Sequence, residues 1–261
     1  MKRFLLFPIV SFAIVASAPA SSLYFINDTT NTLNIFDTVA LTSSLVGATG
    51  ISTSFGDMAW DRTTGTMYAI GGRGNASLYT INLATGAATL VGNHGITDLF
   101  ALGVDAAGNL YAQGTPQANP NVNVFTLSKV TGAASNVGLN NVYPGGYTFN
   151  TTTGQMIYAE AGGGGIYDVN LATGAANFLA ATGSINDNDI AYDASMNDYW
   201  SLDYNGQASR YDSLFNRTLM QTGLGGIAAA DFATPVPEPG TMAVIGLGLV
   251  ALIKKRRAKA S

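Results

Sequence analysis

One unit of about 44 residues recurs along most of the chain, and it constrains the fold more than any other feature. Each copy begins with a short apolar strand that ends in an acidic or amide residue. A tight turn follows, and then three further short strands, the first of which carries an aromatic residue. The anchor residues that end the first strands are 44, 45 and 43 residues apart; they are Asp61, Asp105, Asn150 and Asp193. A period of 40–45 residues with four short strands predicts an all-β chain built from β-propeller blades.

The two ends of the repeating region together supply a fifth unit. Tyr24 lies 44 residues before Tyr68, so residues 23–47 provide the second to fourth strands of a unit whose first strand is missing. That strand is found at the other end of the region as GIAAADF, residues 226–232, which fits in two registers. We therefore predict a single five-bladed propeller over residues 21–233, closed by pairing of its N- and C-terminal strands, which leaves no free sheet edge. A β-sandwich or an open β-solenoid is the alternative.

The first twenty residues have the three parts of a secretory signal peptide. A basic start is followed by an apolar run over residues 4–15 and then by small residues. Cleavage after Ala20 places Ala18 and Ala20 at the two positions that must be small, and cleavage after Ala18 is the alternative. We expect residues 1–20 to form a signal helix that signal peptidase removes, because the apolar run is short for a membrane span. An N-terminal membrane anchor is the other interpretation.

The C-terminal residues 234–261 show a second ordered pattern. A Pro-rich spacer precedes an apolar run, Thr241–Ile253, which we expect to form a short helix. Four basic residues follow it and would stop translocation and remain in the cytoplasm; they are Lys254, Lys255, Arg256 and Arg257. Because the apolar run is shorter than the usual 20 residues or so of a membrane span, we expect insertion into the inner membrane to be transient.

The triplet Pro237-Glu238-Pro239, the apolar helix and the basic cluster, in this order, resemble the PEP-CTERM protein-sorting signal. The resemblance covers residues 235–257 and implies nothing about the fold of the repeating region. It implies that an exosortase, a membrane transpeptidase-like enzyme, recognises Pro237, Glu238 and Pro239 and cuts near them. It also implies export to the surface or matrix of a Gram-negative bacterium that makes exopolysaccharide. A plain tail anchor with a chance triplet is the alternative.

Composition and charge exclude several classes of function. The chain has no Cys and one His, which excludes zinc–thiolate sites, Cys nucleophiles and multi-histidine metal centres. Between Arg3 and Lys254 there are five basic residues and sixteen acidic ones. A nucleic-acid backbone requires clustered Lys and Arg, so we expect no nucleic-acid partner.

Few residues suggest chemistry of their own. Asp57 and Asp189 lie at equivalent places near the start of first strands, so both can face the channel of a propeller, where paired carboxylates would serve acid–base chemistry. Asp187 and Asp189 belong to Asn186-Asp187-Asn188-Asp189, a set of oxygen ligands that calcium accepts, although it lacks the spacing of an EF-hand and also fits a polar turn. His94 lies in a loop without a nucleophile elbow. We assign no catalytic residue, and we expect no cofactor, with calcium as the one candidate ion.

These observations predict an exported protein of the cell surface or extracellular matrix. We expect a non-catalytic binding or structural role, in association with exopolysaccharide or with a matrix protein. The alternative is a propeller enzyme, a hydrolase or lyase acting on a glycan or lactone, with acids such as Asp57 and Asp189 in the channel. Polar side chains that converge on the channel would favour the enzyme, whereas a channel closed by Ala, Gly and Thr would favour binding.

Overall fold

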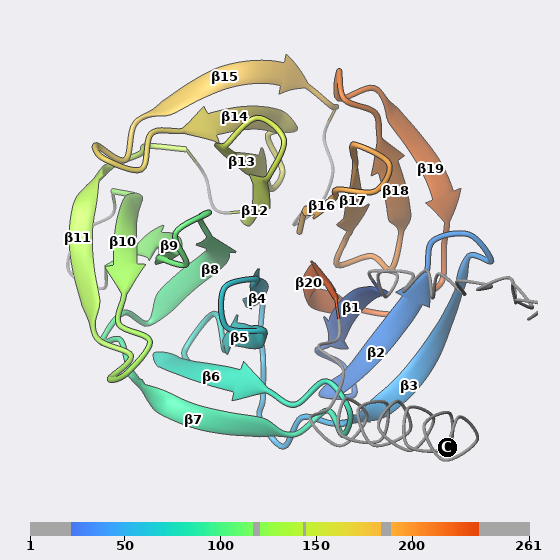
Figure 1. The fold of residues 1–261 in the computed structure, drawn as a ribbon, viewed down its shortest axis with the longest axis horizontal. Coiled ribbons are helices and arrows are strands. Elements are labelled where there is room, and N and C mark those ends of the chain that lie inside the picture. Colours follow the sequence, from blue (N-terminus) through green and yellow to red (C-terminus); the bar gives the residue numbers. More distant parts are fainter. Residues whose placement is uncertain (1–21, 117–120, 143–144, 184–188, 235–261) are drawn as a thin grey trace, which may run out of the picture.

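The protein is a ring of five four-stranded antiparallel sheets (Figure 1). The computed structural model describes residues 22–116, 121–142, 145–183 and 189–234. These stretches contain twenty strands and no helix, which confirms the predicted all-β, five-bladed propeller. In the same stretches no helix is long and apolar enough to cross a membrane. The expected signal helix and the expected C-terminal helix lie outside the described residues.

Each blade runs from an inner strand at the centre of the ring to an outer strand at its rim (Figure 1). Blade 1 consists of β4 (Asp57–Asp61), β5 (Thr66–Ile70), β6 (Ser77–Ile81) and β7 (Ala88–Asn93). Blade 2 consists of β8 (Asp98–Val104), β9 (Leu110–Thr115), β10 (Asn123–Leu127) and β11 (Ala134–Leu139). Blade 3 consists of β12 (Gly145–Asn150), β13 (Gln155–Glu160), β14 (Gly165–Val169) and β15 (Ala176–Ala181). Blade 4 consists of β16 (Ala191–Asp193), β17 (Asp198–Leu202), β18 (Ala208–Tyr211) and β19 (Arg217–Gln221). Blade 5 consists of β20 (Ile227–Ala233), β1 (Ser22–Asn27), β2 (Thr32–Asp37) and β3 (Thr42–Ala48).

Blade 5 joins the two ends of the repeating region, as the sequence predicts. The sheet order is β20-β1-β2-β3, so the last described strand is the inner strand of the blade that contains the first three. The pairing of Tyr24 with Asp231 settles the register that the sequence left open. Ser22 pairs with Ala233, so the first residue of β1 and the last residue of β20 lie side by side. This closure leaves no inner strand without a neighbour.

Burial decreases from the centre to the rim. Every residue of β4 and β20 is buried, because these strands pack between neighbouring blades on both faces. The outer strands expose most of their side chains. The aromatic residues at matching places in the second strands belong to the core: Tyr24, Tyr68, Tyr158 and Trp200 are buried, and Tyr111 is half-buried.

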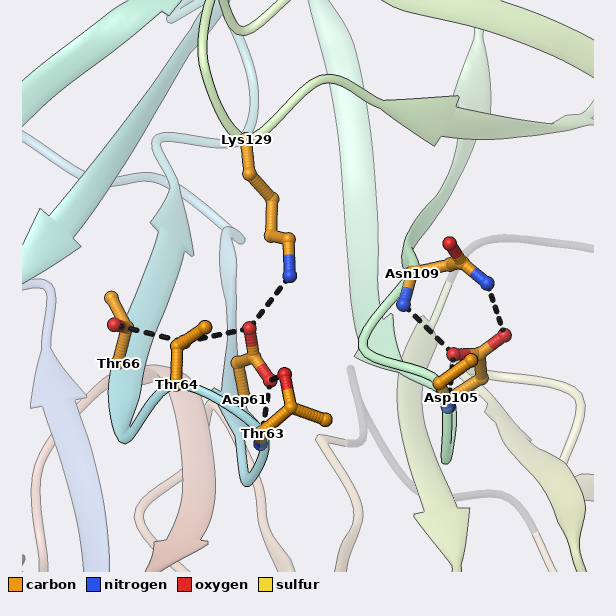
Figure 2. Close-up of polar contacts among 8 residues, drawn as sticks. Asp61, Thr63, Thr64, Thr66, Asp105, Asn109 and Lys129 are labelled. Atoms are coloured by element: carbon orange, nitrogen blue, oxygen red, sulfur yellow. Dashed lines mark hydrogen bonds and ion pairs between the residues drawn. The ribbon is translucent and has the colours of Figure 1, made fainter.

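The anchor residues of the repeat cap the turns that follow them (Figure 2). The Asp61 carboxylate accepts the backbone N–H of Thr63 at 2.9 Å, and Asp105 accepts that of Asn109 at 2.8 Å. Asp61 also pairs with the Lys129 ammonium of the next blade at 2.7 Å. Burial disfavours the charged form of Asp61, but its donors, led by Lys129, outweigh burial and lower its pKa to about 2. The strongest feature of the repeat is therefore turn chemistry, which fixes hairpins rather than a binding site.

A β-bulge recurs at the same place in the outer strand of all five blades. The bulged residues are Val46, Val91, Val137, Leu179 and Met220. In three blades a glycine follows the bulge, and the turn of the neighbouring blade lies directly against it. A Cβ atom on Gly92 would lie 2.0 Å from the carbonyl oxygen of Thr131. The rim of the ring thus depends on close backbone contact between blades.

Replacing Gly92 by alanine is expected to lower the free energy of unfolding by about 1–3 kcal/mol, because the new methyl group overlaps a backbone carbonyl of the next blade. Ala180 occupies the equivalent position in blade 3, after the bulge at Leu179. Ala180→Gly is therefore the matched control, and we expect it to cost less than about 1 kcal/mol. Urea denaturation measures both. A Gly92→Ala protein as stable as the wild type would contradict the close contact.

Candidate functional site

The structure brings Asp57 and Asp189 together at the centre of the ring. Asp57 is the first residue of β4, and Asp189 lies two residues before β16. Their exposed fractions are 0 % and 5 %, and their side chains hydrogen-bond to each other. Burial raises the pKa of both carboxyls well above the usual value. A hydrogen bond between two carboxyl groups requires a proton, and burial favours the protonated form, so the pair holds at least one proton.

The Asp57 carboxylate accepts backbone amides from three blades. One oxygen accepts the N–H of Met58 at 2.6 Å, within its own strand. The other accepts the N–H of Leu102 in blade 2 at 2.6 Å and that of Tyr147 in blade 3 at 3.2 Å. Since all these donors are buried backbone groups, the carboxylate satisfies amides that would otherwise have no partner at the centre of the ring.

Other inner-strand side chains connect the remaining blades in the same way. Asp189 accepts the backbone N–H of Ala230 in blade 5. Asp231 of blade 5 accepts the backbone N–H of Trp60 in blade 1 at 2.6 Å. Between blades 3 and 4, the Thr148 hydroxyl accepts the N–H of Tyr192 at 2.8 Å. Asp231 and Thr148 were not predicted from the sequence. Both occupy the position of Ala59 in blade 1: Asp231 through the register of β20 with β1, and Thr148 through the register of β12 with β13.

This network gives the central acids a structural role. Polar side chains do converge at the centre, the feature expected of an enzyme, but the oxygens of Asp57 and Asp189 are occupied by backbone N–H groups and by each other. Asp187, the other calcium candidate, lies outside the described residues together with most of its cluster. Within the described stretches, no group of three or more His, Asp or Glu residues is placed to hold a metal ion.

The buried acids give stability a pH dependence that Asp231→Asn should reveal. Burial raises the pKa of Asp231 to about 6, from 3.8 for a free Asp. The folded state therefore retains a proton that the unfolded chain releases, so this stabilisation is complete below pH 4 and is lost as the pH rises through 6. At about 1.4 kcal/mol per pKa unit, Asp231→Asn should gain roughly 3 kcal/mol relative to the wild type between pH 4 and pH 7. Urea titrations across this range measure the difference, and parallel curves for the two proteins would contradict it.

His94 is placed as a core residue rather than a catalytic one. It is 5 % exposed, and its Nδ1 atom accepts the backbone N–H of Ile96 at 3.3 Å. Burial lowers its pKa to about 4, so the imidazole is neutral at pH 7. Protonation of His94 on acidification destabilises the folded state, whereas protonation of Asp231 stabilises it. The contribution of His94 is common to the wild type and Asp231→Asn, so it cancels when the two are compared.

Aromatic rings and one arginine form a cluster on one end of the ring. We call this end the crossover face, because the chain passes there from one blade to the next, as in residues 49–56 between β3 and β4. Phe55 stacks on Tyr204 with the ring centroids 4.6 Å apart. The guanidinium of Arg73 lies 4.5 Å from the centroid of Phe55 and 5.4 Å from that of Phe100. Tyr204 is 38 % exposed, so the cluster reaches solvent.

A polar groove of about 550 Å³ begins at this cluster. It lies between the segment that leads into β4 and the β5–β6 turn, and hydroxyl and amide side chains dominate its walls. The lining residues are Ser52, Thr53, Ser54, Arg73, Gly74, Asn75, Ala76, Ser77 and Asn93. Its volume lies in the range of small-molecule sites, and its hydroxyls and amides suit a ligand with many hydrogen-bonding groups. This groove could not be predicted from the sequence, because its lining residues do not follow the spacing of any known binding motif.

Comparison with known proteins identifies the C-terminal segment. Residues 235–257 match the PEP-CTERM protein-sorting motif. This confirms the resemblance stated above, and it marks the protein as an exported, surface-associated substrate that an exosortase processes. The motif starts two residues after β20 ends at Ala233, so a cut within it leaves the closing strand in the ring. A comparison with curated proteins finds no match.

Solved structures share the fold of the body. A chain in the crystal structure of a nidogen/laminin complex is similar, with a TM-score of 0.55 and 12 % identity, over 83 % of this chain and 82 % of that one. A structural-genomics protein of unknown function from Bacteroides thetaiotaomicron VPI-5482 also has a TM-score of 0.55 and 12 % identity, over 85 % of this chain and 60 % of that one. At this identity the similarity shows the fold alone.

Proposed function

We propose that this exported exosortase substrate is a non-catalytic binding module of the cell surface or extracellular matrix, and that its ligand is extracellular polysaccharide. The observation that carries the proposal is the polar groove on the crossover face, which begins at a cluster of aromatic rings in which Tyr204 is exposed and Phe55 and Phe100 are half-buried. Sugars are bound by such combinations, because ring C–H groups pack on aromatic faces while hydroxyls bond to polar side chains. The oxygens of the central acids Asp57 and Asp189 already take part in hydrogen bonds within the ring, which argues against the alternative of a glycan- or lactone-acting enzyme.

The route to the surface is part of the same proposal. Signal peptidase would cut after Ala20 or Ala18, and residues 241–253 would anchor the protein transiently in the inner membrane of a Gram-negative bacterium until the exosortase acts. Because the chain enters and leaves the ring at paired residues, Ser22 and Ala233, both processing segments would emerge from the same end of the ring. Ser22 and Ala233 lie at the end of the ring opposite the crossover face. The groove would therefore face away from the membrane while the protein is anchored.

Co-sedimentation with exopolysaccharide from the producing cells tests the proposal. The protein used is residues 21–235, which include every strand of the ring. We expect binding, and we expect Tyr204→Ala to weaken it about two- to tenfold, because an exposed ring of the cluster is lost. Val130→Ala removes a highly exposed apolar side chain from the turn after β10 and should leave binding unchanged. Parallel samples with and without calcium test the candidate ion, and failure to sediment in both would refute the proposal.

A further inference from the structure

We propose that Arg73 binds the carboxylate of an acidic sugar, so that the groove selects uronate-containing polysaccharide over neutral polysaccharide. This inference rests on the proposed function and adds the chemical class of the ligand. The planar guanidinium of Arg73 lies 4.5 Å from the centroid of the Phe55 ring and 5.4 Å from that of the Phe100 ring. Both rings therefore pack against it, while its N–H groups form no hydrogen bond or ion pair with any described residue. A guanidinium edge of this kind matches a carboxylate with two parallel hydrogen bonds.

Two backbone irregularities direct the rings onto Arg73. Phe55 has a φ of 52°, a left-handed conformation that is unfavourable for a non-glycine residue. Phe100 is the bulged residue of β8, because the pairing with β9 shifts register between Leu99 and Ala101. A bulge changes the direction of a side chain, and bulges are frequent beside functional sites. These two features do not bury the rings, which both remain partly exposed.

The backbone holds the arginine loop in place. The N–H of Ser54 bonds to the Gly71 carbonyl at 2.9 Å, and the N–H of Arg73 bonds to the Ser54 carbonyl at 2.8 Å. A Cβ atom on Gly72 would lie 2.0 Å from the same Ser54 oxygen, so the two segments are in direct contact. The Asn75 amide adds a bond to the Ser52 carbonyl at 3.1 Å. A site held in this way loses little conformational entropy when a ligand binds.

The groove beside Arg73 contains an unused hydroxyl. Thr53 is 5 % exposed and lines the groove, and its Oγ1 atom has no hydrogen-bond partner. An unpaired buried hydroxyl is costly, and a sugar hydroxyl would satisfy it. A carboxylate on Arg73 and ring hydroxyls along the groove describe an acidic sugar rather than a free phosphate or a neutral glycan.

The overall charge of the body limits which acidic polymers fit. Residues 21–233 contain five basic and fifteen acidic residues, so their long-range field repels a densely charged polyanion. A polysaccharide whose uronates are separated by neutral sugars would reduce this repulsion and still place one carboxylate on Arg73. A short oligosaccharide with a single uronate is therefore the appropriate probe.

Isothermal titration of the ring, residues 21–235, with an oligosaccharide that ends in one glucuronate tests the inference. The matched ligand is the same oligosaccharide with the carboxylate reduced to a primary alcohol. We expect the reduced ligand to bind about tenfold more weakly or worse, because hydrogen bonds to a charged group are lost. Arg73→Gln should abolish the difference in affinity between the two ligands. Arg73→Lys should retain part of it, since lysine keeps the positive charge but lacks the two parallel N–H donors of the guanidinium.

Arg62→Gln is the control for net charge, because Arg62 is exposed in the turn after β4, away from the crossover face. It should keep the discrimination between the two ligands. Equal binding of both ligands by the wild type, or unchanged discrimination in Arg73→Gln, would overturn the role of Arg73 and leave the proposed function standing. No binding of either ligand would also overturn the inference, and the co-sedimentation experiment would then decide separately whether the protein binds polysaccharide.

Discussion

Asp57→Ala is expected to lower the free energy of unfolding by about 3–5 kcal/mol, a large share of the stability of a domain. The substitution leaves three buried backbone N–H groups without an acceptor, those of Met58, Leu102 and Tyr147. Each unsatisfied buried donor costs about 1–3 kcal/mol. Asp189 also loses the carboxyl group to which it is hydrogen-bonded. Part of the loss is offset, because one buried carboxyl no longer has to be desolvated.

Asp105→Ala is the matched control for Asp57→Ala. Asp105 is also an aspartate that accepts backbone amides, those of Ala107 and Asn109, but it lies in an exposed turn. We expect this change to cost about 1 kcal/mol. Asp57→Asn should lie between the two, since it keeps the volume and one acceptor oxygen. Denaturation at pH 6 measures all three, and a loss in Asp57→Ala no greater than that in Asp105→Ala would show that the central carboxylate does not hold the blades together.

Truncation after Gly226 is expected to abolish cooperative folding. It removes β20, all of whose residues are buried, and with it the inner strand of blade 5. The edge of β1 would then be unpaired from Ser22 to Asn27. Trp60 would lose the acceptor Asp231, and Asp189 would lose the donor Ala230. Together these losses should exceed the 5–15 kcal/mol by which domains are stable, so circular dichroism should show no thermal transition.

The control for this truncation ends the chain after Thr234, which keeps β20 and removes the sorting motif. We expect it to melt like the full ring, because every described contact of blade 5 is retained. A peptide of residues 227–234 added to the shorter protein should restore a transition by pairing with the open edge of β1. A cooperative transition without the peptide would mean that the ring does not depend on its closing strand.

Features that depend on neighbours in the sequence could be predicted. The anchor residues are readable because they cap turns two to four residues away, as Asp61 does for Thr63 and Asp105 for Asn109. Such local chemistry repeats in the four blades whose inner strand is followed by a turn, so its period gives the length of a blade, and the spacing of Tyr24 and Tyr68 adds the fifth. The C-terminal sorting motif is readable for a similar reason, since it is defined by the order of its parts along the chain. The equivalence of Asp57 and Asp189 also followed from the repeat.

The sites that only tertiary structure reveals join residues that are distant in sequence. Asp231 and Trp60 are 171 residues apart, and Asp57 and Tyr147 are 90 apart. Which of these groups meet depends on the order of the blades around the ring and on the register of β20. In the same way, a bulge at Phe100 and a left-handed Phe55 place two rings on Arg73, although no spacing in the sequence indicates it.

The sequence by itself therefore determined the class of fold, the number of blades, the way the ring closes and the signal at its C-terminus, because each rests on local pattern or periodicity. Tertiary structure decided what the special residues do. It assigned the central acids to the backbone amides of neighbouring blades, since burial makes those amides require acceptors. It also brought an arginine, two phenylalanines and a polar groove together on the crossover face, where solvent can reach them.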